Sequence, residues 1–111
     1  NTLTGMKVDI QRKAFVLANK TGGVSGPAIH PIAVRMVYEA ANAVNVPIIG
    51  MGGIATAEDA IEMLLVGASA VSVGTANFYN PAVTMEIVDG IEQYMEAQGF
   101  ASVADMVGIV K

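Results

Sequence analysis

The sequence contains no cysteine and is poor in charge: 14% of its 111 residues are charged, and only six are Lys or Arg. Without cysteine, this segment cannot supply a disulfide, a thiolate ligand set for zinc or iron–sulfur, or a thiol nucleophile. Ten acidic residues give a formal net charge of −4, which argues against binding to nucleic acid or to an anionic membrane surface. No apolar run approaches the roughly 18 residues of a membrane span, and no signal-peptide pattern is present. We therefore expect a cytoplasmic protein that binds no nucleic acid, membrane or metal through this segment.

Hydrophobic residues make up 53% of the sequence, which is typical of a globular, core-rich chain of at most one domain. Residues 5–19 alternate loosely between apolar and polar side chains around a polar centre, which predicts a small β-hairpin. Residues 20–26 are predicted to form a loop. Pro31 stands where a first helical residue is favoured, and apolar side chains at three-to-four spacing predict an amphipathic helix over 31–44.

The next segment alternates between strand and helix. A strand is predicted over 46–50. Thr56 and Asp59 have the spacing of a capping box, and the helix that they begin should stop near Gly67. A second strand is predicted over 70–74. Both strands are almost continuously apolar, which is typical of a parallel sheet covered on both faces.

Two more helices are predicted in the last third of the chain. Asn80 and Pro81 make a good cap and first turn for a helix to about Gln98, with Gly99 as its stop. The serine that opens residues 102–105 should cap one more short helix. Five apolar side chains of the longer helix are expected to face inward: Ile87, Val88, Ile91, Tyr94 and Met95.

This order of elements predicts an α/β fold, the C-terminal portion of a (β/α)8 TIM barrel with about two barrel strands, flanking helices and a small hairpin. A complete barrel needs roughly 250 residues, so this chain can hold only its last two to three units. The chain opens at Asn1 without methionine, and we interpret residues 1–111 as a partial domain whose remainder lies upstream. Because open strand edges leave backbone groups unpaired, we expect the isolated chain to be marginally stable or to associate.

Each predicted strand ends in glycine and leads into a helix start. The two junctions are Val46-Pro-Ile-Ile-Gly-Met-Gly-Gly53 and Ala70-Val-Ser-Val-Gly-Thr-Ala76. Glycine lets the backbone come close to an oxyanion, and the N–H groups of a helix start point toward it. In a (β/α)8 barrel the last two strand-to-helix loops are the usual phosphate site. The pattern therefore predicts a phosphate held mainly by backbone amides, which an acidic chain can provide.

Four motifs follow one another in the chain: Asn1-Thr-Leu-Thr-Gly-Met6 with Asp9, Gly22-Gly-Val-Ser-Gly-Pro-Ala28 with Pro31, Ile48-Ile-Gly-Met-Gly-Gly53, and Val73-Gly-Thr-Ala-Asn77. Together they closely resemble the C-terminal third of the dihydroorotate dehydrogenases of class 1, type B, the NAD-linked form. The resemblance extends to about residue 98. Four motifs in the right order are far more specific than any single glycine cluster.

The resemblance implies an FMN-containing enzyme and a role for seven residues. Five fall on positions that contact FMN, chiefly its phosphate and ribitol tail: Gly26, Gly52, Gly53, Gly74 and Thr75. Asn1 and Thr2 fall on the substrate-binding pair, where a carboxamide and a hydroxyl can meet the polar edge of a pyrimidine. The family's general base is a cysteine on an upstream loop, so we assign no catalytic residue here and expect the chain alone to be inactive.

The implied reaction is the oxidation of dihydroorotate to orotate in pyrimidine (UMP) biosynthesis, with hydride passing to the flavin. In type B enzymes the electrons continue to NAD+ through a partner subunit that carries FAD and a [2Fe-2S] cluster. The resemblance also implies a homodimer of catalytic subunits within a heterotetramer. No motif for FAD or for the cluster is present in this chain, so the partner follows from the resemblance alone.

Two alternatives remain open from the residues themselves. The first is another phosphate-binding TIM-barrel flavoenzyme, which would keep the two glycine-rich junctions. The second is a non-catalytic half-barrel that serves as a binding or assembly module through its open strand edges. His30, the only histidine, is expected to cap or flank the helix that begins at Pro31 rather than to act in catalysis.

Overall fold

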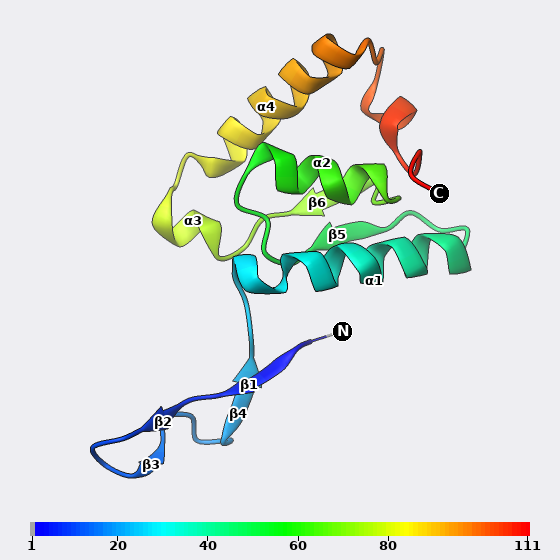
Figure 1. Cartoon of the computed structure of the whole chain (residues 1–111). Coiled ribbons are helices and arrows are strands. Elements are labelled where there is room, and N and C mark those ends of the chain that lie inside the picture. Colours follow the sequence, from blue (N-terminus) through cyan, green and yellow to red (C-terminus); the bar gives the residue numbers. More distant parts are fainter. Residues whose placement is uncertain (1) are drawn as a thin grey trace.

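The computed structural model describes residues 2–111. Its elements follow in the order expected for a short hairpin region and two strand–helix units (Figure 1). In chain order they are β1 (Thr4–Met6), β2 (Val8–Asp9), β3 (Ala14–Phe15), β4 (Thr21–Gly23), η1 (Pro27–Ile29), α1 (His30–Ala43), β5 (Ile49–Met51), α2 (Ala57–Leu65), β6 (Ala70–Ser72), α3 (Ala76–Tyr79), α4 (Val83–Gln98) and η2 (Val103–Met106).

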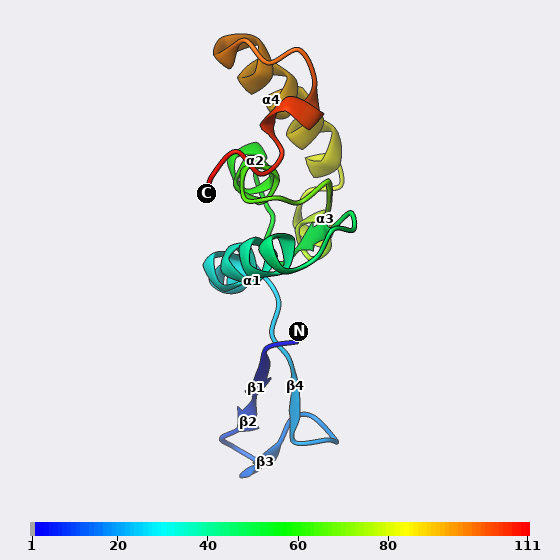
Figure 2. The same cartoon turned by 90° about the vertical axis from the view of Figure 1, so that its right-hand side faces the viewer.

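Residues 3–24 form an arm that extends away from the rest of the molecule (Figures 1 and 2). β2 pairs with β3 as the predicted hairpin, and β1 pairs with β4, both antiparallel. The prediction of a loop over 20–26 is thus wrong for Thr21–Gly23, because these residues complete the ladder begun by β1. The molecule is elongated as a result: its radius of gyration is 16.5 Å, against about 13 Å for a compact chain of this length.

The remaining residues, 25–111, form a body built on the parallel pair β5 and β6. Ile49 aligns with Ala70 and Met51 with Ser72, as the strand predictions require, although each strand is shorter than predicted. α1 packs against β5, and α2 packs against both strands (Figure 1). Gly50, the buried residue of β5, lies against Met63 of α2.

The expectation of a sheet covered on both faces is wrong for the residues described. Ile49 and Met51 are 60% and 61% exposed, because side chains alternate between the faces of a strand and these two point away from the helices. A (β/α)8 barrel buries that second face only when further strands close around it.

α2 lies at the centre of the body and carries most of its core. Its residues Met63 and Ala60 are fully buried, and Ile61 and Leu64 face a second cluster around Met106. α4 approaches α2 very closely at Gly90, where an added β-carbon would lie 2.3 Å from that of Ala57. Helix contact at this distance requires glycine, so Gly90 sets how the two helices pack.

The predicted capping boxes are confirmed. The Thr56 hydroxyl accepts from the Asp59 amide, and Asp59 accepts in return, which fixes the start of α2. Ser102 and Asp105 cap η2 in the same way, and Gly99 ends α4 in the left-handed conformation with φ 76°.

The start of α4 differs from its prediction. The helix begins at Val83 rather than at Pro81, and the short helix α3 precedes it. The Asn80 side chain accepts from the Ala82 amide, which forms a turn and not a helix cap. Val88 is 55% exposed, whereas Val83 and Ile87 are buried in the core, so the stripe that α4 buries is narrower than predicted. No helix within residues 2–111 has the length and apolar character needed to cross a membrane.

Candidate functional site

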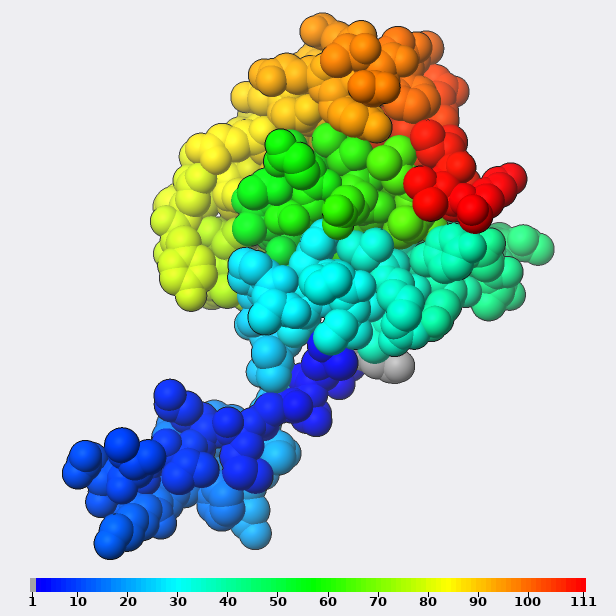
Figure 3. All heavy atoms as spheres, viewed as in Figure 1, coloured from blue at the N-terminus to red at the C-terminus, as the bar shows by residue number. Residues whose placement is uncertain are grey.

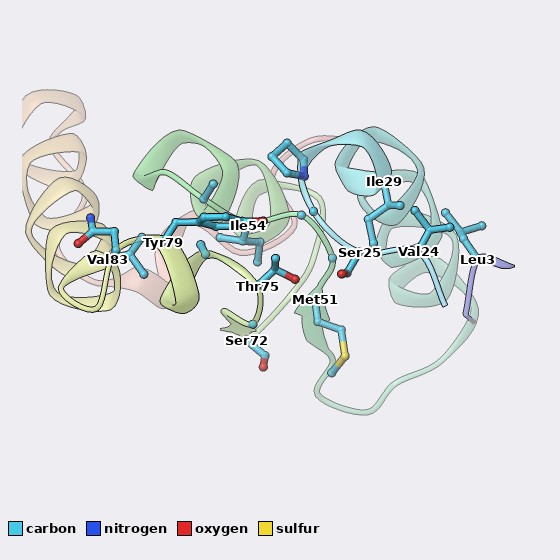
Figure 4. A pocket seen from close by; sticks show the side chains of 18 of the residues that line it. Leu3, Val24, Ser25, Ile29, Met51, Ile54, Ser72, Thr75, Tyr79 and Val83 are labelled. Carbon is cyan, nitrogen blue, oxygen red and sulfur yellow. The ribbon is translucent and has the colours of Figure 1, made fainter. Parts of the chain in front are cut away.

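A cavity of about 470 Å³ opens between the base of the arm and the carboxyl ends of β5 and β6. Figure 4 shows Ser25 and Thr75 on opposite sides of its opening, with Met51, Ile54 and Tyr79 completing the wall. None of the residues 2–111 that line it carries a charged side chain. The lining consists of Thr2, Leu3, Val24, Ser25, Gly26, Pro27, Ile29, Met51, Gly52, Gly53, Ile54, Ala55, Ser72, Gly74, Thr75, Ala76, Tyr79, Asn80 and Val83.

Residues predicted from separate motifs come together in this one cavity. All five residues expected to contact a cofactor line it: Gly26, Gly52, Gly53, Gly74 and Thr75. Thr2 of the predicted substrate pair lines the same cavity, whereas Asn1 lies outside the residues that the structure describes. The structure thus brings together positions up to 73 residues apart in the chain.

The end of β5 is packed tightly against the start of η1. Gly53 has φ 68°, and a β-carbon added there would lie 2.6 Å from the Gly26 carbonyl oxygen and 2.9 Å from the His30 backbone nitrogen. Only glycine fits this conformation and this spacing without a shift of the backbone. A larger residue at position 53 would therefore disturb the protein's own loop before it reached a ligand.

The end of β6 is open by contrast. A β-carbon added at Gly74 would have nothing within 4 Å, so the backbone of this residue faces free space in the cavity. The amides of Gly53, Gly74, Thr75 and Ala76 donate no hydrogen bond to any acceptor within residues 2–111. Unpaired backbone N–H groups on both sides of one cavity are suited to bind an anion.

The two amides just before α2 are already occupied. The Asp59 carboxylate accepts from the amides of Ala55 and Thr56, both at 2.9 Å. The amides of Ala55 and Thr56 are therefore not free to bind a ligand, because the Asp59 carboxylate already accepts from them.

His30 lies directly behind this wall of the cavity. It is buried at 6% exposure, and its Nδ1 lies 2.9 Å from the Gly52 carbonyl oxygen. Its Nε2 lies 3.0 Å from Glu62 Oε2 and 3.6 Å from Asp59 Oδ1. The expectation that His30 flanks the helix after it is confirmed, since α1 begins at this residue, but the side chain also joins α1 to the end of β5 and to α2.

Comparison with known proteins decides the family. A model of the dihydroorotate dehydrogenase family matches residues 1–95. The chain belongs to this family. It is 60% identical to dihydroorotate dehydrogenase B (NAD(+)), catalytic subunit, of Lachnoclostridium phytofermentans, over 100% of this chain and 37% of that protein. It is 58% identical to the protein of the same name from Alkaliphilus oremlandii, over 97% of this chain and 36% of that protein.

The dihydroorotate dehydrogenase family also accounts for the fold. A crystal structure of DHODH from Eimeria tenella in complex with ferulenol superimposes with a TM-score of 0.77 at 28% identity, over 98% of this chain and 29% of that one. The prediction of a partial TIM barrel is confirmed, with one parallel strand pair and no closed barrel in the residues described. The chain spans little more than a third of the length of its two relatives named above.

Sequence reasoning missed several residues of the cavity. Ser25 lies within a motif that carries the family resemblance, but its hydroxyl was given no role. Tyr79 and Val83 were missed because α3 was not predicted, and this helix carries the chain from the end of β6 along the rim of the cavity. The signal in the sequence that indicates Ser25 is its position between Gly23 and Gly26, within a glycine-rich loop.

Proposed function

We propose that residues 1–111 are the C-terminal part of an FMN-binding catalytic subunit that oxidises dihydroorotate to orotate and passes electrons to NAD+ through a partner subunit. The observation that carries this proposal is the cavity at the ends of β5 and β6, where the five residues matching FMN positions meet. Family membership and the relatives named NAD(+) type support the substrate and the electron acceptor.

The residues present fit an FMN phosphate. The cavity volume of about 470 Å³ lies within the usual range of small-molecule sites, roughly 300–1,000 Å³. Unpaired amides at Gly53, Gly74 and Thr75 would hold the phosphate, and the Ser25 and Thr75 hydroxyls could add donors. Because no carboxylate lines the cavity within residues 2–111, an anion there meets no like charge.

The rest of the enzyme lies outside this segment in our proposal. FMN would accept hydride from the substrate, and this chain would bind and orient both molecules. Thr2 would meet the pyrimidine together with Asn1, while the general-base cysteine would come from elsewhere, since this chain contains none. The electron-transfer subunit would carry FAD and a [2Fe-2S] cluster, and the catalytic subunits would form a homodimer within the heterotetramer.

The substitution Gly74→Val in the full-length subunit tests this proposal. The new side chain enters open space, so it should leave the folded protein intact while it blocks the phosphate, and FMN content should fall by more than about tenfold. Flavin absorbance per protein after purification measures the effect, and the unfolding midpoint of the flavin-free protein should not change. Ala101→Val, on an exposed residue outside the cavity, is the matched control.

Three results would contradict parts of the proposal. Normal FMN content in Gly74→Val would overturn the assignment of the cavity. A wild-type subunit that binds FMN but does not reduce it with dihydroorotate would point to another phosphate-binding flavoenzyme. A stable dimer that binds no flavin would favour the assembly module. Gly53→Val is the poorer test, because its side chain would collide with the protein's own backbone.

A further inference from the structure

The cavity at the ends of β5 and β6 has two ends that different parts of the chain form. Figure 4 shows Tyr79 of α3 at one end and Leu3 of the arm at the other. The unpaired amides of Gly74 and Thr75 belong to the α3 end, because α3 begins directly after them. A phosphate held by these amides would therefore lie toward the α3 end.

Met51 projects into the cavity from the wall between these ends. It is the last residue of β5, and its side chain stands on the strand face that points away from the helices, where it is 61% exposed. In the ladder it pairs with Ser72 of β6, which also lines the cavity. Figure 4 shows both side chains extending to the same side. Met51 thus presents a largely exposed apolar side chain to any molecule in the cavity.

A second cavity, of about 370 Å³, places Met51 with the arm end. Four residues line both cavities: Thr2, Leu3, Ile29 and Met51. Within residues 2–111, no residue of β6 or α3 lines the second cavity. Met51 therefore shares a space with Thr2 that the phosphate-binding end of the first cavity does not reach.

The proposed function decides in which direction FMN would extend from its phosphate. Hydride passes from the substrate to the flavin ring, so the ring and the substrate must be in contact. Thr2 is the described member of the predicted substrate pair, and it lies at the arm end of the cavity. With the phosphate at Gly74 and Thr75, the ring would extend toward the arm end, where Met51 is.

We propose that Met51 is a cofactor-contact residue: its thioether packs against the flavin ring and positions the ring beside Thr2. This inference rests on the proposed FMN function, which supplies the ligand. Methionine suits the role because its unbranched side chain adapts to the shape of a neighbour and its sulfur makes favourable contacts with aromatic rings.

NMR of carbon-13-labelled methionine methyl groups in the full-length subunit tests the contact. When FMN is added to the flavin-free protein, the ring current of the flavin should shift the Met51 signal, which is assigned by its absence in Met51→Leu. Met85 is the matched control, because it is 64% exposed on α4 and lines neither cavity. Its signal should not move. An unshifted Met51 signal in a protein that binds FMN would refute the contact and leave the proposed function standing.

The FMN dissociation constant gives a second readout. Met51→Ala should raise it by about tenfold, the equivalent of about two buried CH₂ groups. Met51→Leu keeps the volume of the side chain and should raise it less. The unfolding midpoint of the flavin-free protein should stay the same in both variants, since Met51 is not part of the core. Met85→Ala should bind FMN like wild type, and wild-type affinity in Met51→Ala would overturn the inference.

Tyr79→Ala distinguishes the two ends of the cavity. Tyr79 is 84% exposed and lines the α3 end. A ring that lay against α3 would make Tyr79→Ala the more damaging substitution for FMN affinity, and that order would overturn the inference; we expect Met51→Ala to be the more damaging. A wild-type subunit that binds no FMN would refute the proposed function, and this contact with it.

Discussion

The arm and the body of this molecule are built on different principles. In the arm, every described residue from 3 to 24 is exposed or half-buried, and the strands are held by backbone pairing. In the body, α2 packs against β5, β6 and α4 around fully buried side chains such as Met63. Hydrophobic burial is the dominant favourable term in folding, so the stability of this segment must reside in the body.

The arm and the body also differ in net charge. The arm holds Lys7, Arg12, Lys13 and Lys20 against the single acid Asp9, a formal net charge of +3. The other residues include nine acidic ones and only two basic ones, Arg35 and Lys111, so their formal net charge is −7. The net charge of −4 of the whole chain is therefore the sum of two regions of opposite sign. Figure 3 shows how far the basic arm stands from the body. The cavity, whose lining within residues 2–111 carries no charged side chain, lies where the two regions meet.

The largest effect that separates the two regions should come from Met63→Ala. Met63 is fully buried in the core, and removal of its side chain leaves a cavity, so the free energy of unfolding should fall by about 3 kcal/mol. Phe15→Ala removes a large side chain from the arm that is 49% exposed and should cost far less. Denaturant unfolding of the flavin-free, full-length subunit measures both. Equal losses would show that the arm is buried in the full-length protein.

The contact between α2 and α4 should give the next largest effect. Gly90→Ala normally favours a helix, but here its new methyl group would meet Ala57, so we expect a net loss of about 1–2 kcal/mol. Ala57→Gly removes the β-carbon that the new methyl group would meet, so the double variant should regain most of the lost unfolding free energy. A double-mutant cycle on the unfolding free energies measures this coupling. Simple additivity would mean that the helices do not meet at these residues.

The capping box of α2 should have a smaller effect. Thr56→Ala removes the side-chain acceptor for the Asp59 amide and should cost about 1 kcal/mol of unfolding free energy. Thr84→Ala makes the same chemical change at an exposed position on α4 and serves as the control. If the two substitutions have the same effect, the hydrogen bond at Thr56 contributes nothing to the body's stability.

The parts of the fold predicted from sequence are those that neighbouring residues decide. The spacing of Thr56 and Asp59 is itself the capping box, and Gly99 ends α4 because the left-handed conformation suits glycine. The order of strand and helix predicted the parallel pair β5–β6, and with the family resemblance it predicted which residues meet at the strand ends.

The parts that could not be predicted depend on distant partners. Thr21–Gly23 is a strand only because β1 lies beside it, and two of its three residues are glycine, which disfavours strands. Val88 is exposed although it belongs to the apolar stripe of α4, because the position of α2 decides which side of that stripe is buried and the periodicity of α4 does not show it. His30 reaches Glu62 across 32 positions of sequence, and no local pattern links the two.

The smallest effect should come from the arm's ion pair between Arg12 and Asp9. The two groups are 3.8 Å apart and the Arg12 side chain is 85% exposed, so water and salt screen their attraction. Arg12→Ala should leave the unfolding midpoint of the full-length subunit unchanged within error, at low salt as well as at high salt. The Asp9 carboxylate also accepts from the amides of Gln11 and Arg12, and these bonds hold the hairpin turn without the guanidinium. A clear, salt-dependent loss would show instead that Arg12 meets an acidic surface in the assembled protein, and the arm would then be an interface whose order depends on its partner.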